Sequence, residues 1–152
     1  MPTASATPPD LVADIGGTNA RFALIDANRQ PYAEQILPCA AFPDLTAAAQ
    51  AYLAAVGEPR PTQAAIAVAT PISGDWIQFT NSNWSFSTEA VGRALDLERL
   101  LILNDFTALA LALPLLNPDE RRAVGGGTAV EEAPIGLLGP GTGLGVSGLV
   151  WS

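Results

Sequence analysis

The stretch Asp14-Ile15-Gly16-Gly17-Thr18-Asn19-Ala20-Arg21, residues 14–21, decides the fold of this chain. It lies between two apolar runs typical of β-strands, residues 11–15 and 21–26. Because glycine has no Cβ, a Gly-Gly-Thr turn lets backbone N–H groups converge on an anion such as phosphate. A dinucleotide-binding turn or a P-loop continues into a helix, and no Lys-Ser or Lys-Thr pair follows these glycines. The stretch therefore predicts a phosphate-binding β-hairpin.

A second glycine-rich turn lies near the end of the sequence. There Gly141-Thr142-Gly143 interrupts an apolar segment, residues 137–146. One such turn alone is more often an ordinary tight turn than a binding site. Two turns with the same Gly-Thr centre predict a pair of hairpins that hold a polyphosphate from both sides.

Composition limits the classes of function. A length of 152 residues suits one domain with a proper core. The net charge of -8 argues against nucleic acid and anionic membranes as partners. Cys39 is the single cysteine, so no intrachain disulfide is expected and the cytoplasm is the expected compartment. Histidine is absent, which excludes Ser-His-Asp triads and leaves acid–base chemistry to carboxylates.

The apolar pattern predicts a mixed α/β order of elements. Strands are expected at residues 11–15, 21–26, 33–38, 63–69, 76–80 and 100–103, and a final hairpin at 135–151. Helices are expected over residues 44–56, from Ser87 to Leu95, and over 106–113. Asp44 or Thr46 would cap the first helix and Gly57 would stop it. The nearly continuous apolar runs at 63–69 and 100–103 indicate strands buried on both faces.

Asn104-Asp105 follows a predicted strand and precedes a predicted helix. An Asp in this place is most often a helix cap. The alternative is a general base that accepts a proton from a substrate hydroxyl, with Asn104 bound to the neighbouring hydroxyl. The absence of histidine and the two glycine-rich hairpins add weight to this second interpretation, and both interpretations stay open.

Two further groups have both a functional and a structural interpretation. Asp75-Trp76 and residues 80–85 combine short polar side chains with aromatic rings, which suits a sugar. The same residues also suit a turn-rich loop. Asp14 could orient Mg²⁺, through water because this ion keeps much of its hydration shell, or could simply be a polar residue at a strand end.

Four segments together resemble the bacterial glucokinases of the hexokinase–actin–Hsp70 superfamily. They are LVADIGGTNARFALID (11–26), AVATPISGDWIQFTNSNWSFS (67–87), LILNDFTALALALP (101–114) and GPGTGLGVSGLV (139–150). The resemblance implies an α/β fold, a ribonuclease-H-like mixed sheet with flanking helices of the actin-like ATPase superfamily. It implies phosphoryl transfer from MgATP to the 6-hydroxyl of glucose, the first step of glycolysis, and it leaves a homodimer open.

The resemblance also implies residue roles. The ATP phosphates would be held by Ala13, Asp14, Ile15, Gly16, Gly17, Thr18 and Asn19 and by Gly141, Thr142 and Gly143. Asp105 would deprotonate the glucose 6-hydroxyl, Asn104 would bind the sugar beside it, and Asn81 lies in the matching sugar-side loop.

The family's kinases are longer than this sequence, so the resemblance covers their N-terminal half. The expected organisation is a disordered tail (1–9), an N-terminal α/β domain (10–116), a connection (117–134) and the start of a second domain (135–152), with the chain truncated before that domain is complete. Two alternatives are a non-catalytic nucleotide- or sugar-binding fragment and an actin-like assembly protein. Asn104-Asp105 and the loop at 80–87 favour a kinase over the assembly protein, and only turnover separates a kinase from a binding fragment.

Overall fold

The glycine-rich stretch closes a β-hairpin, as its sequence predicts. The computed structural model describes residues 7–57, 60–80, 82–140 and 144–151. In it β1 (Asp10–Ile15) pairs antiparallel with β2 (Asn19–Ile25). The Gly16 N–H donates to the Asn19 carbonyl at 3.0 Å and so closes the turn. The chain continues from this turn as a strand and not as a helix, which confirms the hairpin.

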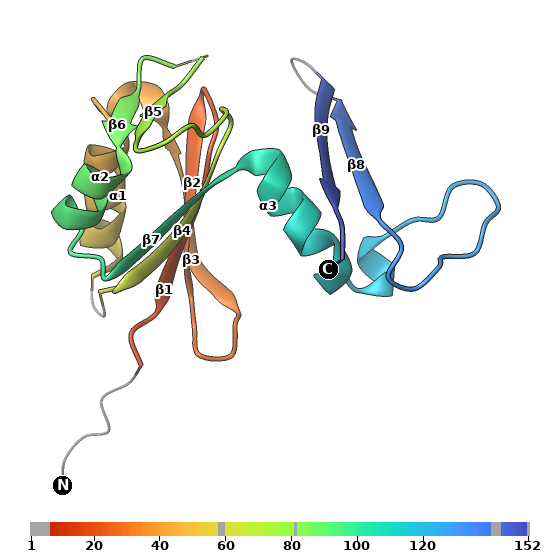
Figure 1. Ribbon diagram of the computed structural model, residues 1–152. Coiled ribbons are helices and arrows are strands. Elements are labelled where there is room, and N and C mark those ends of the chain that lie inside the picture. The colour runs from red at the N-terminus through yellow and green to blue at the C-terminus, as the bar shows by residue number, and fades with distance from the viewer. Residues whose placement is uncertain (1–6, 58–59, 81, 141–143, 152) are drawn as a thin grey trace, which may run out of the picture. The chain divides into compact units, whose positions relative to one another are not determined.

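The first of two compact units, Met1–Asn104, is built on a five-stranded mixed sheet. The strand order is β3-β2-β1-β4-β7, with β3 at Pro31–Pro38, β4 at Gln63–Val68 and β7 at Arg99–Asn104. Strands β1, β4 and β7 run parallel (Figure 1). Strand β2 pairs antiparallel with β1, and β3 pairs antiparallel with β2. The mixed α/β class is thereby confirmed. The division at residue 104 rests on contacts, and the expected domain limits stay a prediction.

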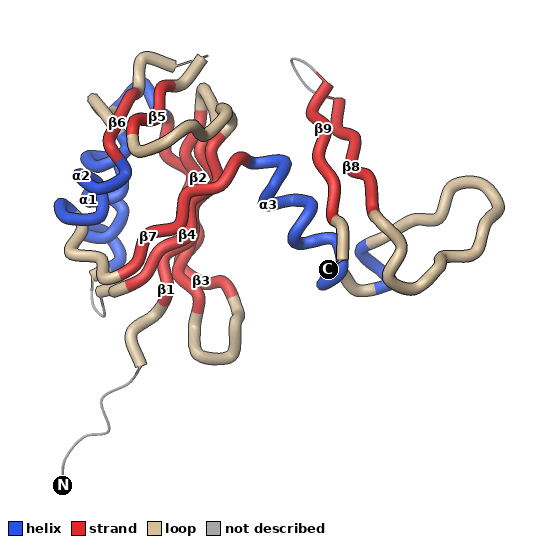
Figure 2. Tube along the Cα trace, viewed as in Figure 1, coloured by secondary structure: helices blue, strands red, loops and turns tan. Residues whose placement is uncertain are grey.

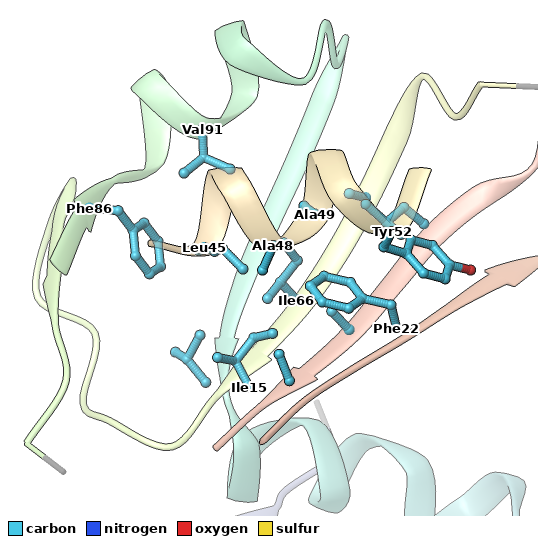
Figure 3. Packing of buried hydrophobic residues seen from close by; sticks show 14 of the residues in the cluster. Ile15, Phe22, Leu45, Ala48, Ala49, Tyr52, Ile66, Phe86 and Val91 are labelled. Carbon is cyan, nitrogen blue, oxygen red and sulfur yellow. The ribbon is translucent and has the colours of Figure 1, made fainter. Parts of the chain in front are cut away.

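Helices α1 (Leu45–Val56) and α2 (Thr88–Ala94) cover one face of this sheet (Figures 1 and 2). Helix α1 begins where its sequence predicts, because the Asp44 carboxylate accepts the Ala47 N–H at 2.8 Å. It ends at Gly57, whose φ of 85° is a conformation that glycine adopts without strain. Figure 3 shows the core between α1 and the sheet, where the Phe22 and Tyr52 rings stack with centroids 5.2 Å apart.

The prediction that two strands are buried on both faces is wrong within this unit. On β4, residues Ala64, Ile66 and Val68 are buried, while the alternate residues are exposed or half-buried. Strand β7 forms an edge of the sheet, and its Leu101 is 45% exposed. An apolar run shows that its side chains favour burial, but whether one or both faces of the strand are covered depends on the tertiary fold.

A small second sheet connects β4 to α2. Strands β5 (Trp76–Gln78) and β6 (Ser85–Ser87) pair antiparallel, and β6 was not expected from the sequence. Ser87 nevertheless caps α2 as predicted, since its hydroxyl oxygen accepts the Ala90 N–H at 3.1 Å. A 3₁₀ turn, η1 (Cys39–Ala41), follows β3.

The second unit, Asp105–Ser152, contains one helix and one hairpin. Helix α3 (Asp105–Ala112) leads into the 3₁₀ turns η2 (Leu113–Leu115) and η3 (Pro118–Glu120). Strands β8 (Ile135–Pro140) and β9 (Leu144–Leu149) pair antiparallel, as the predicted final hairpin requires. Across the described parts of both units, every helix is too short or too polar to cross a membrane.

Candidate functional site

Three parallel strands bring their carboxyl ends to one edge of the first unit's sheet. The Ile15 carbonyl at the end of β1 accepts the Ala69 N–H just after β4, at 3.1 Å. Asn104, the last residue of β7, stands opposite Val68 in the register. The Gly16-Gly17-Thr18 turn and Asn104 therefore lie at the same end of the sheet, the carboxyl end of its parallel strands, where open α/β sheets bind their ligands.

The turn between β1 and β2 is held by a hydrogen bond within it and by another from Cys39 of η1. The sequence predicts that the Gly-Gly-Thr turn offers its N–H groups to an anion. The N–H of Gly16 is not available for this, because it bonds within the turn. The N–H groups of Gly17 and Thr18 have no hydrogen-bond acceptor among the described residues. The Thr18 carbonyl accepts the Cys39 N–H at 2.8 Å, and the Cys39 Sγ lies 3.5 Å from the Gly16 carbonyl oxygen.

Cys39 was not expected at this site, because its neighbours in sequence carry no binding pattern. The residue is buried, and desolvation raises the pKa of its thiol. The thiol therefore keeps its proton and can donate to the Gly16 carbonyl. Only the pairing of β2 with β3 brings Cys39 beside the turn.

A pocket of about 590 Å³ joins the turn to the loop predicted to bind a sugar. It is lined by Gly17, Cys39, Ala40, Phe42, Pro43, Thr80, Ser82, Asn83 and Trp84. Trp84 forms a buried wall of this pocket: the residue is 3% exposed, and its Nε1–H donates to the Phe42 carbonyl at 3.1 Å. Asn81 lies outside the described residues.

Asn104 is held at the sheet edge by its own side chain. Its Nδ2 group donates to the Thr70 carbonyl at 3.3 Å. Thr70 is a buried polar residue whose hydroxyl donates to the Gln78 carbonyl at 3.0 Å. Thr70 thus links the Asn104 side chain to β5, because its carbonyl accepts from Asn104 and its hydroxyl donates to Gln78.

Asp105 is the first residue of α3 and belongs to the second unit. Its Oδ1 accepts the N–H of Phe106 at 2.9 Å, which satisfies one of the first N–H groups of the helix. This bond agrees with the capping interpretation, and it does not exclude a general base.

The structure assigns Asp75 a structural role. Its Oδ1 accepts the Thr88 hydroxyl at 2.6 Å and the Glu89 N–H at 2.9 Å, at the start of α2. The hydroxyls of Ser87 and Thr88 and the Glu89 N–H lower the pKa of Asp75 to about 2. Asp75 therefore caps α2 together with Ser87, which favours the loop interpretation for this part of the 75–85 segment.

The remaining predicted phosphate residues differ in accessibility. Ala13 and Ile15 are buried, in a strand that pairs on both sides, so their side chains face the core. Asn19 and Thr18 are exposed. Asp14 faces Arg21 across the hairpin, with Arg21 Nη1 3.0 Å from Asp14 Oδ2 and side chains 53% and 60% exposed. Gly141, Thr142 and Gly143, in the second hairpin, lie outside the described residues.

These features define a class of protein. A mixed sheet of order β3-β2-β1-β4-β7 with a glycine-rich turn after β1 is an α/β domain of the actin-like ATPase superfamily. The chain belongs to the glucokinase family, whose model, described as Glucokinase, matches residues 11–152.

Relatives of known sequence and structure agree with this assignment. The chain is 50% identical to the glucokinase of Neisseria meningitidis over 151 residues, which cover 99% of this chain and 46% of the relative. It is 52% identical over 142 residues to the "Bifunctional protein glk" of Burkholderia pseudomallei, covering 93% of this chain and 22% of that protein. A crystal structure of a glucokinase from an Antarctic psychrotroph matches with a TM-score of 0.83 and 40% identity, over 95% of this chain and 47% of that one. The chain thus spans less than half the length of these relatives.

Proposed function

We propose that this chain forms the N-terminal part of a glucokinase, which transfers a phosphoryl group from MgATP to the 6-hydroxyl of glucose. The observation that carries the proposal is the pocket that Gly17 shares with Thr80, Ser82 and Asn83. It joins a turn suited to phosphate with a loop suited to sugar hydroxyls. Membership of the glucokinase family and relatives that bear this name support the same activity.

On the donor side, backbone groups bind the phosphates of ATP. Gly17 and Thr18 offer N–H groups at the turn, and Asn19 adds an exposed side chain. Gly16 shapes the turn through its bond to the Asn19 carbonyl. Gly141, Thr142 and Gly143 of the second hairpin complete the phosphate contacts. N–H groups suit this acidic chain, because they bind anions without adding charged side chains.

On the acceptor side, Asn104 and Asn81 bind sugar hydroxyls, and Asp105 is the general base. As the glucose 6-oxygen attacks the γ-phosphorus, its proton passes to the Asp105 carboxylate. The bond from the γ-phosphorus to its bridging oxygen breaks, and ADP leaves. A carboxylate held near the nucleophilic oxygen is a side chain suited to this proton transfer.

Asp14 is suited to a magnesium ion that is mostly hydrated. Its carboxylate is exposed beside the turn, and the described residues contain no cluster of three or more Asp, Glu, His or Cys able to hold a metal. Mg²⁺ keeps several waters and binds proteins through one or two carboxylates together with substrate phosphates. When bound, the ion would neutralise charge on the β- and γ-phosphates.

The setting we propose is the cytoplasm, with glucose and ATP as partners and neither nucleic acid nor membrane. The net charge of -8 and the single cysteine support this setting. A homodimer is compatible with the same activity.

Asp105→Asn tests the proposal in the full-length product of the gene that encodes this chain. The variant keeps size and most capping ability but cannot accept the proton, so kcat should fall by about 10²–10⁴. The melting temperature should stay near that of the wild type. A coupled assay for glucose 6-phosphate and a thermal melt measure the two effects.

The matched control is Asp119→Asn, an exposed residue of η3 in the same unit, which should change neither quantity. Normal turnover with a melting temperature lowered by the loss of about 1 kcal/mol would show that Asp105 is only a cap. A wild-type product that binds ATP and glucose without turnover would identify a binding protein.

A further inference from the structure

The ring of Phe106 lies against two glycines of the second hairpin. Gly139 on β8 and Gly145 on β9 are register partners. A Cβ placed on Gly139 would lie 2.5 Å from Cζ of Phe106, and one placed on Gly145 would lie closer still. Because real Cβ atoms do not approach other atoms so closely, the tip of the ring occupies the space that two side chains would fill.

The ring, and not the backbone, explains these glycines. Neither Gly139 nor Gly145 has a left-handed φ, so other residues fit their backbone conformation. Gly136 on the same strand provides the comparison, because a Cβ there would meet nothing within 4 Å. Close approach of Phe106 is therefore the feature that distinguishes the pair Gly139 and Gly145.

Phe106 also contacts Asp105 directly. It follows Asp105 in the chain, and its N–H donates to the Asp105 carboxylate at 2.9 Å. One residue thus holds the carboxylate through its backbone and the hairpin through its ring. Gly139 and Gly145 lie just before and just after the turn expected to bind the ATP phosphates.

We infer that Phe106 is a positioning residue, which sets the spacing between the Asp105 carboxylate and the β8–β9 hairpin. This inference rests on the proposed function, in which Asp105 serves the sugar hydroxyl and the hairpin serves ATP. In-line transfer needs both in a fixed relation, and a displacement of about 1 Å can cost about 10²-fold in rate.

Gly145→Ala tests the inference in the full-length product. The added methyl group displaces the ring, so kcat should fall by about 10²-fold while KM for glucose and KM for ATP stay close to the wild-type values. Gly136→Ala is the matched control: it makes the same change on the same hairpin away from Phe106, and kcat should not change. The assay follows glucose 6-phosphate at saturating glucose and MgATP.

A double variant distinguishes positioning from general damage. Leu is shorter than Phe and leaves room for the methyl group, so Phe106→Leu with Gly145→Ala should lower kcat no further than Phe106→Leu alone. Independent effects would instead multiply the two losses and overturn the inference. If Gly145→Ala does not fold, Gly139→Ala, with its less severe overlap, takes its place in the same cycle.

The outcomes separate this inference from the proposed function. An active wild type whose Gly145→Ala variant has a lower melting temperature but normal kcat would show that Phe106 only packs, and the proposed function would stand. A wild-type product without glucose phosphorylation would overturn the proposed function and this inference with it.

Discussion

Gly17 is the residue at which the first hairpin and the pocket meet. Its N–H is not used within the turn, and it lines the same pocket as the polar residues of the 80–84 loop. Gly16 has a different role, because its N–H closes the turn. The two adjacent glycines thus differ in position: Gly16 closes the turn through its N–H, and Gly17 lines the pocket.

Gly17→Val should weaken binding of MgATP by about 10–150-fold. A hydrogen bond to a charged group contributes about 1.5–3 kcal/mol, which corresponds to that range of affinity. The branched side chain stands where phosphate must approach the N–H groups. Titration with MgATP measures the effect, after a thermal melt has shown that the variant folds.

Gly126→Ala is the control for Gly17→Val, since a Cβ at Gly126 would meet nothing within 4 Å. It should leave both the affinity and the melting temperature unchanged. Unchanged nucleotide affinity in Gly17→Val would mean that the hairpin is a turn without a binding role.

Helix α2 shows at the level of an element how charge supports the fold. Asp75 accepts hydrogen bonds at the helix start, where N–H groups are otherwise unpaired and the helix dipole favours a negative charge. The pKa of Asp75 is lowered from 3.8 to about 2. Its carboxylate therefore stabilises the fold above pH 3.8, and this contribution disappears as the pH falls through 2.

Asp75→Asn should lower the melting temperature at neutral pH, with a difference from the wild type that shrinks between pH 3.8 and about 2. In acid the protonated Asp75 resembles the amide, so the two proteins converge. Thr88→Val removes one donor to Asp75 and should show a smaller difference with the same dependence on pH. Melts of the three proteins from pH 2 to 7 test this, and a constant difference between Asp75→Asn and the wild type would contradict it.

Elements with strong local signals could be predicted from the sequence. Asp44 and Gly57 delimit α1 because each acts on the backbone beside it. Strand β6 could not be predicted, because three residues are too few to show an alternating apolar pattern. It forms through its pairing with β5. The contacts of Cys39 with Gly16 and of Phe106 with Gly139 and Gly145 could not be predicted from the sequence either, because each joins residues that are distant in the chain.

At the scale of the molecule, the buried hydrophobic cluster belongs entirely to the first unit. Among the described residues of the second unit, only Ala110 is a fully buried hydrophobic residue. An isolated two-stranded hairpin is at best marginally stable in water, and one short helix covers little of it. The first unit is therefore stabilised by a hydrophobic core of its own, and the described part of the second unit has no comparable core.

Residues 7–104 should fold alone and unfold cooperatively, whereas residues 105–152 alone should not. The reason is that the first unit contains the sheet, α1, α2 and the cluster between them. Thermal melts of the two separate fragments, followed by circular dichroism, measure this. A cooperative melt of residues 105–152 would contradict the expectation.

The strand order also has a consequence during protein synthesis. Strands β1, β2 and β3 pair with their neighbours in sequence, whereas β7 joins the sheet only through β4, and local pairs form faster than distant ones. Asn104 leaves the ribosome 85 residues (104 minus 19) after Asn19. At about 5–20 residues per second this delay is roughly 4–17 s. We therefore expect the nascent chain to form the glycine-rich turn between β1 and β2 several seconds before Asn104 has been synthesised.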